Sequence, residues 1–211
     1  MFWKKNVSKK ELGVALAYLA LSLHNREAKL FDSIYNCSNL SKEYRIRCSW
    51  ETTYFYISLM LIYVLAFLPS RKSGYYKDLF TSYWEEYDRF LMLGDPSTEE
   101  YEYHIASTQL RYDVYGDIGD EAIKNKENIG QEIAHIFLKA IRYIKLTKID
   151  DIDMESFFET NIDELKQNIT EEEGGGGEYF NKNNPHNIAL QNIQADMIEN
   201  IKKLLKKFKI V

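Results

Sequence analysis

The chain has 211 residues, of which 45% are hydrophobic and 28% carry a charge. This composition is typical of a globular domain and excludes wholesale disorder. Two cysteines are too few for a disulfide scaffold or a four-cysteine zinc site, and three prolines argue against a turn-rich all-β fold.

The charge is distributed unevenly. Residues 1–50 hold nine Lys/Arg and four Asp/Glu (net +5), residues 51–200 hold 13 and 28 (net −15), and residues 201–211 hold five lysines (net +5). The total of −5 argues against general affinity for nucleic acid, so no nucleic-acid partner is expected. We expect the basic ends to fold back on the acidic middle or to stay solvated, with an anionic partner or a membrane as the alternative.

The N-terminal part of the chain predicts a helix. Ser8 and Glu11 have the spacing of a capping box, in which each side chain satisfies a free amide of the first turn. Apolar residues then recur at helical spacing to Leu23, and the pattern resumes as far as Ile34. The basic start and apolar run also resemble a signal peptide, but Glu11 at the edge of that run favours the helix.

A second helix is predicted from Lys42 to Leu68, closed by Pro69. Its segment 52–68 is uncharged and is close to the length that a membrane span requires. Threonine, serine and tyrosine dilute the apolar character, so we predict a buried central helix and a cytoplasmic protein. A membrane-associated protein, anchored through 52–68 or through the basic C-terminal helix, is the alternative.

Further helices follow along the chain. Apolar spacing predicts one that follows Gly74 and runs to Leu91, and one from a second capping box, Ser97 to Glu100, to about Tyr115. Residues 116–126 contain two glycines and are expected to form a loop. The clearest amphipathic pattern predicts a helix over 127–146, and a further pattern runs from Met154 to Ile169.

The low-complexity stretch of three glutamates and four glycines predicts a flexible linker over residues 171–183. It separates a helical core, residues 1–170, from a C-terminal amphipathic helix in residues 184–211. We expect this helix to dock on the bundle or on a neighbouring chain through Ile193, Met197, Ile201, Leu204 and Phe208. No strand of useful length is predicted, and the fold class is all-α, a single bundle of about seven helices.

Motifs with chemical meaning are sparse. Phosphate-binding glycine loops, zinc-binding motifs and hydrolase motifs are absent from the sequence. Glu132 and His135 share one helix face, and Glu100 and His104 share another, which makes these four the candidate ligands of a metal-binding helical-bundle enzyme. The Glu-x-x-His motif occurs once where a di-metal bundle needs two, so we predict no metal and no cofactor.

Two surfaces are candidates for binding. The first combines tyrosines and acids, which suit a protein interface because a tyrosine ring buries a large area at low entropic cost. Its candidate residues are Tyr75, Tyr83, Glu85, Glu86, Tyr87, Tyr101, Tyr103 and Tyr112. The second is a basic C-terminal face of Lys202, Lys203, Lys206, Lys207 and Lys209. From these features we predict a non-enzymatic protein of the inhibitor, immunity, adaptor or regulatory type, with another protein or a second copy of itself as partner.

Overall fold

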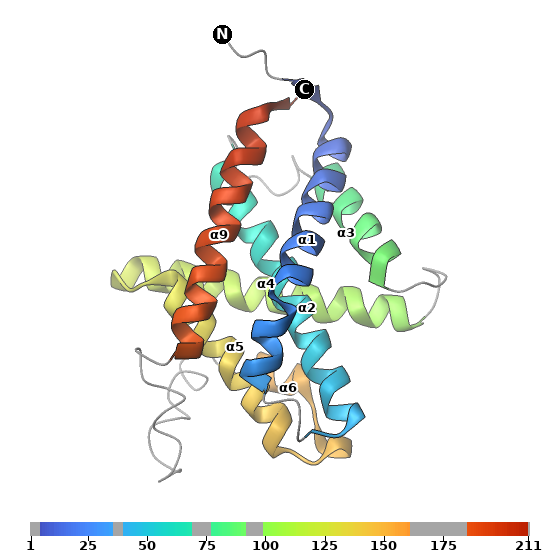
Figure 1. The fold of residues 1–211 in the computed structure, drawn as a ribbon, viewed down its shortest axis with the longest axis vertical. Coiled ribbons are helices and arrows are strands. Elements are labelled where there is room, and N and C mark those ends of the chain that lie inside the picture. Colours follow the sequence, from blue (N-terminus) through green and yellow to red (C-terminus); the bar gives the residue numbers. More distant parts are fainter. Residues whose placement is uncertain (1–4, 36–39, 69–76, 92–98, 161–184, 211) are drawn as a thin grey trace.

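The computed structural model describes residues 5–35, 40–68, 77–91, 99–160 and 185–210. Within these ranges the chain forms seven α-helices, one short 3-10 helix and two short strands (Figure 1). The prediction of an all-α bundle of about seven helices is confirmed. The α-helices are α1 (Lys9–Tyr35), α2 (Lys42–Phe67), α3 (Lys77–Leu91), α4 (Glu99–Asn125), α5 (Ile129–Leu146), α6 (Met154–Glu159) and α9 (Pro185–Lys207).

Local signals start several of these helices. The Ser8 hydroxyl accepts from the Glu11 amide at 3.2 Å, and the Glu11 carboxylate accepts from the Ser8 amide at 2.7 Å, which is the predicted capping box. The side chains of Asn128 and Asp153 cap α5 and α6 by accepting from the amide three residues further on, at 3.3 and 2.9 Å.

Helix α2 lies at the centre and packs against α1, α4, α5 and α9, while α3 packs on the outer side of α1 (Figure 1). Because α2 is apolar on all sides from Thr52 onward, it is stable in water only where neighbours surround it. Phe55 contacts the rings of Phe137 on α5 and Tyr115 on α4, with centroids 4.3 and 5.8 Å apart. Within the described part, α2 alone is long and apolar enough to cross a membrane, and 72% of its most apolar 18-residue window is buried.

Helix α9 lies along α5, α2 and α1. Ile193, Met197 and Ile201 are buried against the core. The Gln194 amide group is also buried and joins three helices, because it accepts from the Tyr63 hydroxyl of α2 and donates to the Gly130 carbonyl of α5 at 2.7 Å.

Two sequence predictions need correction. Residues 116–126 are not a loop, because α4 continues to Asn125 and buries Ile118 and Ala122, whose packing outweighs the helix cost of the two glycines. The C-terminal helix, expected in residues 184–211, ends at Lys207, because Phe208–Ile210 form a short strand, β2, which pairs in parallel with β1 (Lys5–Val7). A three-residue strand is too short for alternation to reveal it. Three predicted features lie outside the described residues: the linker 171–183, the start of the second capping box at Ser97, and the second half of the helix expected over 154–169.

Candidate functional site

An open groove of about 410 Å³ lies between the first half of α2 and α4, and the α5–α6 connection closes one side. A concave site of this volume is within the size range of ligand-binding and side-chain-binding pockets. Its walls come from three places in the chain. They are Glu43, Ile46, Arg47, Trp50, Glu51 and Tyr54 on α2, Tyr103, His104 and Arg111 on α4, and Ile149 and Met154.

The floor of the groove is a buried ion pair. Glu51 is 2% exposed and Arg111 1% exposed, and the Arg111 Nη2 donates to Glu51 Oε2 at 2.8 Å. The Arg111 Nη1 donates to the Ser107 carbonyl at 3.1 Å, and the guanidinium lies 4.3 Å from the centroid of the Phe158 ring. Burial lowers the pKa of Arg111, but the Glu51 carboxylate and two tyrosines oppose this and leave the pKa above its ordinary value. The charge of this arginine is therefore neutralised within the protein.

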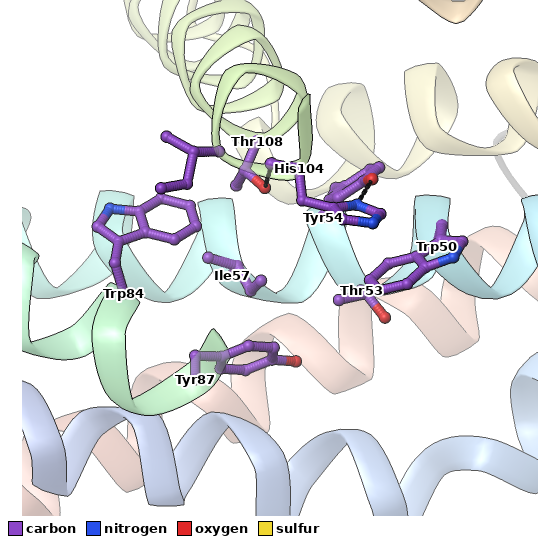
Figure 2. A pocket seen from close by; sticks show the side chains of 9 residues that line it. Trp50, Thr53, Tyr54, Ile57, Trp84, Tyr87, His104 and Thr108 are labelled. Atoms are coloured by element: carbon purple, nitrogen blue, oxygen red, sulfur yellow. Dashed lines mark hydrogen bonds between the residues drawn. The ribbon is translucent and has the colours of Figure 1, made fainter. Parts of the chain in front are cut away.

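Beside the ion pair, Trp50, Tyr54 and His104 form an aromatic cluster (Figure 2). The Trp50 and His104 rings stack with centroids 3.9 Å apart, and the Tyr54 hydroxyl shares a hydrogen bond with His104 Nδ1. Burial raises the pKa of Tyr54, so its hydroxyl stays protonated. The Tyr54 hydroxyl and His104 Nδ1 thus satisfy each other's hydrogen-bonding capacity.

Helical spacing explains how these side chains meet. Trp50 and Tyr54 are four residues apart and share one face of α2. His104, Thr108 and Arg111 follow at steps of four and three and share the face of α4 that packs on α2. The groove is therefore built on two rigid helices rather than on a loop.

A second, much smaller cavity of about 20 Å³ adjoins the same aromatic cluster (Figure 2). Trp84 and Tyr87 of α3 close it on the far side. It is too small for a ligand larger than about one water molecule. The wide groove, and not this cavity, is the candidate site.

The structure divides the tyrosine-and-acid surface that the sequence predicted. Tyr103 is exposed on the groove and Glu85 is exposed on α3, while Tyr112 is half-buried. Tyr83, Tyr87 and Glu86 are buried and form no exposed surface, because the 79–83–87 stripe of α3 packs against α1. Tyr75 and the side chain of Tyr101 lie outside the described residues.

The three candidate metal ligands whose side chains the structure describes do not gather in one place. Glu132 and His135 are half-buried on α5, whereas His104 belongs to the aromatic cluster on α4. No group of three or more His, Cys, Asp or Glu side chains that could hold a metal ion occurs in the described part of the chain. The side chain of Glu100 lies outside that part.

Sequence reasoning missed Trp50, Glu51, Tyr54 and Arg111. One signal for Arg111 was present. The residues 104, 108, 111, 115, 118 and 122 follow one another at steps of three and four, and this stripe of α4 is buried. A charged residue inside a buried helical stripe needs a buried partner of opposite charge. Nothing local identifies that partner as Glu51, which lies 60 residues earlier in the chain.

Comparison with known proteins gives no relative of this chain. It matches no protein-family model, no curated protein and no solved structure. The geometry of the groove is therefore the basis for the functional proposal.

Proposed function

We propose that this protein acts by binding another protein, and that the groove between α2 and α4 receives an apolar or aromatic side chain of the partner. The observation that carries the proposal is the rim of the groove. Ile46 on α2 is 46% exposed and Tyr103 on α4 is 41% exposed, and both line the groove. Large apolar side chains around a concave site are typical of protein interfaces.

The chemistry of the floor favours binding over catalysis. A general acid or base needs a proton-transferring group that faces the substrate. Here the Glu51 carboxylate and the Arg111 guanidinium are bonded to each other, and His104 Nδ1 is bonded to Tyr54. A partner side chain would meet aromatic rings and the Met154 side chain, with Glu43 and Arg47 as the further charged residues that line the groove.

The openness of the groove favours a protein over a small molecule. A pocket for a small ligand encloses most of the ligand's surface. This groove is open to solvent along its rim, so a small ligand would keep much of its surface in water. A protein partner can cover Ile46 and Tyr103 as well as fill the groove.

The test is capture of partners from a lysate of the source cells with three baits. One bait is the unaltered chain, one carries Ile46→Ser with Tyr103→Ser, and the matched control carries Ile123→Ser with Ile188→Ser, two exposed apolar residues outside the groove. We expect at least one protein to be retained by the unaltered and control baits and lost from the groove variant. Circular dichroism of all three checks the fold. Equal retention by all three baits would contradict the proposal.

A further inference from the structure

The pairing of β1 with β2 brings the two basic ends of the chain together. Lys5 pairs with Phe208 and Asn6 with Lys209, and both strands lie at the same end of the bundle (Figure 1). Val7 of β1 is buried, which ties this small sheet to the core. The two ends of the chain, Lys5–Val7 and Phe208–Ile210, therefore contribute to one surface.

Six exposed lysines define this terminal basic patch. The last two turns of α9, the two strands and the start of α1 supply them. They are Lys5, Lys10, Lys202, Lys206, Lys207 and Lys209.

Two acids of α9 are held in ion pairs with basic residues outside the patch. Glu199 pairs with Lys203 at 2.6 Å, and Asp196 pairs with Arg26 at 2.8 Å. Glu11 accepts from the Ser8 amide and hydroxyl at 2.7 and 2.9 Å, keeps its charge, and lies close enough to Lys5 to offset part of the charge of that lysine. Glu199 and Asp196 are paired with residues outside the patch, so the positive potential of the other five lysines adds up at one end of the protein.

An aromatic side chain lies beside the lysines. Phe67, at the end of α2, is 39% exposed, and the Lys202 Nζ lies 4.9 Å from the centroid of its ring. An exposed aromatic ring next to lysines is typical of surfaces that meet the lipid headgroup region, where the ring enters the boundary and the ammonium groups meet phosphates.

We propose that the terminal basic patch, together with Phe67, binds the surface of anionic lipid membranes. A bilayer is a flat polyanion that touches only this end of the molecule. A nucleic-acid duplex would extend past the patch along the acidic remainder of the chain, whose residues 51–200 carry −15. The exposed Phe67 also has a use at a lipid surface and none on a phosphate backbone.

Binding through this patch would fix the orientation of the molecule relative to the membrane. Ile46 on the groove and Phe67 in the patch belong to the same helix, 21 residues apart in the sequence. At 1.5 Å per residue they are about 30 Å apart. The groove would therefore face away from the membrane and stay open to a partner.

Co-sedimentation of the full chain with vesicles tests this proposal. The probes are phosphatidylcholine vesicles with and without phosphatidylserine. The patch variant carries Lys202→Gln, Lys206→Gln, Lys207→Gln and Lys209→Gln, and a matched control removes four other exposed lysines, Lys42, Lys124, Lys126 and Lys148. Both variants have the same net charge, so a difference between them reports the patch and not the total charge.

The unaltered chain and the control should sediment with phosphatidylserine vesicles, bind the neutral vesicles far more weakly, and lose binding as salt is raised. A lysine close to an anionic surface strengthens binding about fivefold, so the patch variant should bind at least about tenfold more weakly. Phe67→Ala should also weaken binding. The proposal is overturned if the unaltered chain ignores phosphatidylserine, if the two lysine variants behave alike, or if the patch instead retains duplex DNA or RNA while vesicles are not bound.

Discussion

Gly13 of α1 lies directly against the backbone of Leu79 in α3. A Cβ atom at position 13 would overlap the Leu79 carbonyl oxygen and would lie 3.0 Å from the Tyr83 nitrogen. The obstacle is backbone rather than a flexible side chain, so the two helices approach this closely only because position 13 has no side chain. This close approach is what buries the 79–83–87 stripe of α3.

Replacing this glycine should therefore destabilise the protein. Gly13→Ala forces α1 and α3 apart and should lower the free energy of unfolding by about 1–3 kcal/mol, the usual cost of overpacking. Gly116→Ala is the matched control, because its Cβ would meet nothing within 4 Å and it is also in a helix interior. It should raise the free energy of unfolding by about 0.5–1 kcal/mol. Urea unfolding followed by circular dichroism measures both, and an unchanged midpoint for Gly13→Ala would refute the close approach.

Removing one partner of the Glu51–Arg111 pair should lower the free energy of unfolding more per substitution than replacing both partners with apolar residues. Glu51→Met leaves a buried, unpaired guanidinium and should lower the free energy of unfolding by about 3–5 kcal/mol. Glu51→Met combined with Arg111→Met removes both charges and should lose much less than the two single substitutions together. A double-mutant cycle in urea supplies the coupling energy. A value near zero would mean that the pair does not form in solution.

Buried tyrosine hydroxyls provide a third comparison. The Tyr83 hydroxyl is buried and has no hydrogen-bond partner within the described residues, whereas the Tyr63 hydroxyl donates to Gln194. Tyr83→Phe should be neutral or stabilising, because it removes a desolvated polar atom. Tyr63→Phe should lower the free energy of unfolding by about 1–3 kcal/mol, because it leaves the Gln194 oxygen unsatisfied. Thermal melts of the two variants compare their stabilities. A larger loss of stability for Tyr83→Phe than for Tyr63→Phe would contradict the view that only the Tyr63 hydroxyl has a hydrogen-bond partner.

His24 predicts a dependence of stability on pH. Burial lowers the pKa of this side chain, which packs on Tyr56 with ring centroids 5.3 Å apart. The folded protein then binds the proton less readily than the unfolded chain, whose histidine titrates near 6.5. The free energy of unfolding should therefore fall as the pH drops below about 6.5. His24→Gln should reduce that slope between pH 7 and pH 5, and His186→Gln should also reduce it, because burial lowers the pKa of His186 as well. A slope that neither variant changes would show that other groups carry the effect.

The helices of this protein were predictable because their signals are local. The Ser8–Glu11 capping box and the uncharged 52–68 run are each contained in one stretch of sequence, and the structure places a helix start and a buried helix there. The same local reasoning failed at Gly116 and Gly119. There the burial of Ile118 and Ala122 against other helices outweighs a weak propensity, and this burial is a tertiary property.

The fold class and the course of most helices follow from local sequence patterns, because periodicity, capping and helix breakers act between residues three or four positions apart. The sites depend on contacts between residues that lie far apart in the chain. Glu51 meets Arg111 across 60 residues, and Lys5 pairs with Phe208 across nearly the whole chain. Those pairings depend on how α2, α4 and α9 pack against their neighbours. Because the energy of packing is shared among many side chains, no short stretch of sequence predicts which residues will face each other.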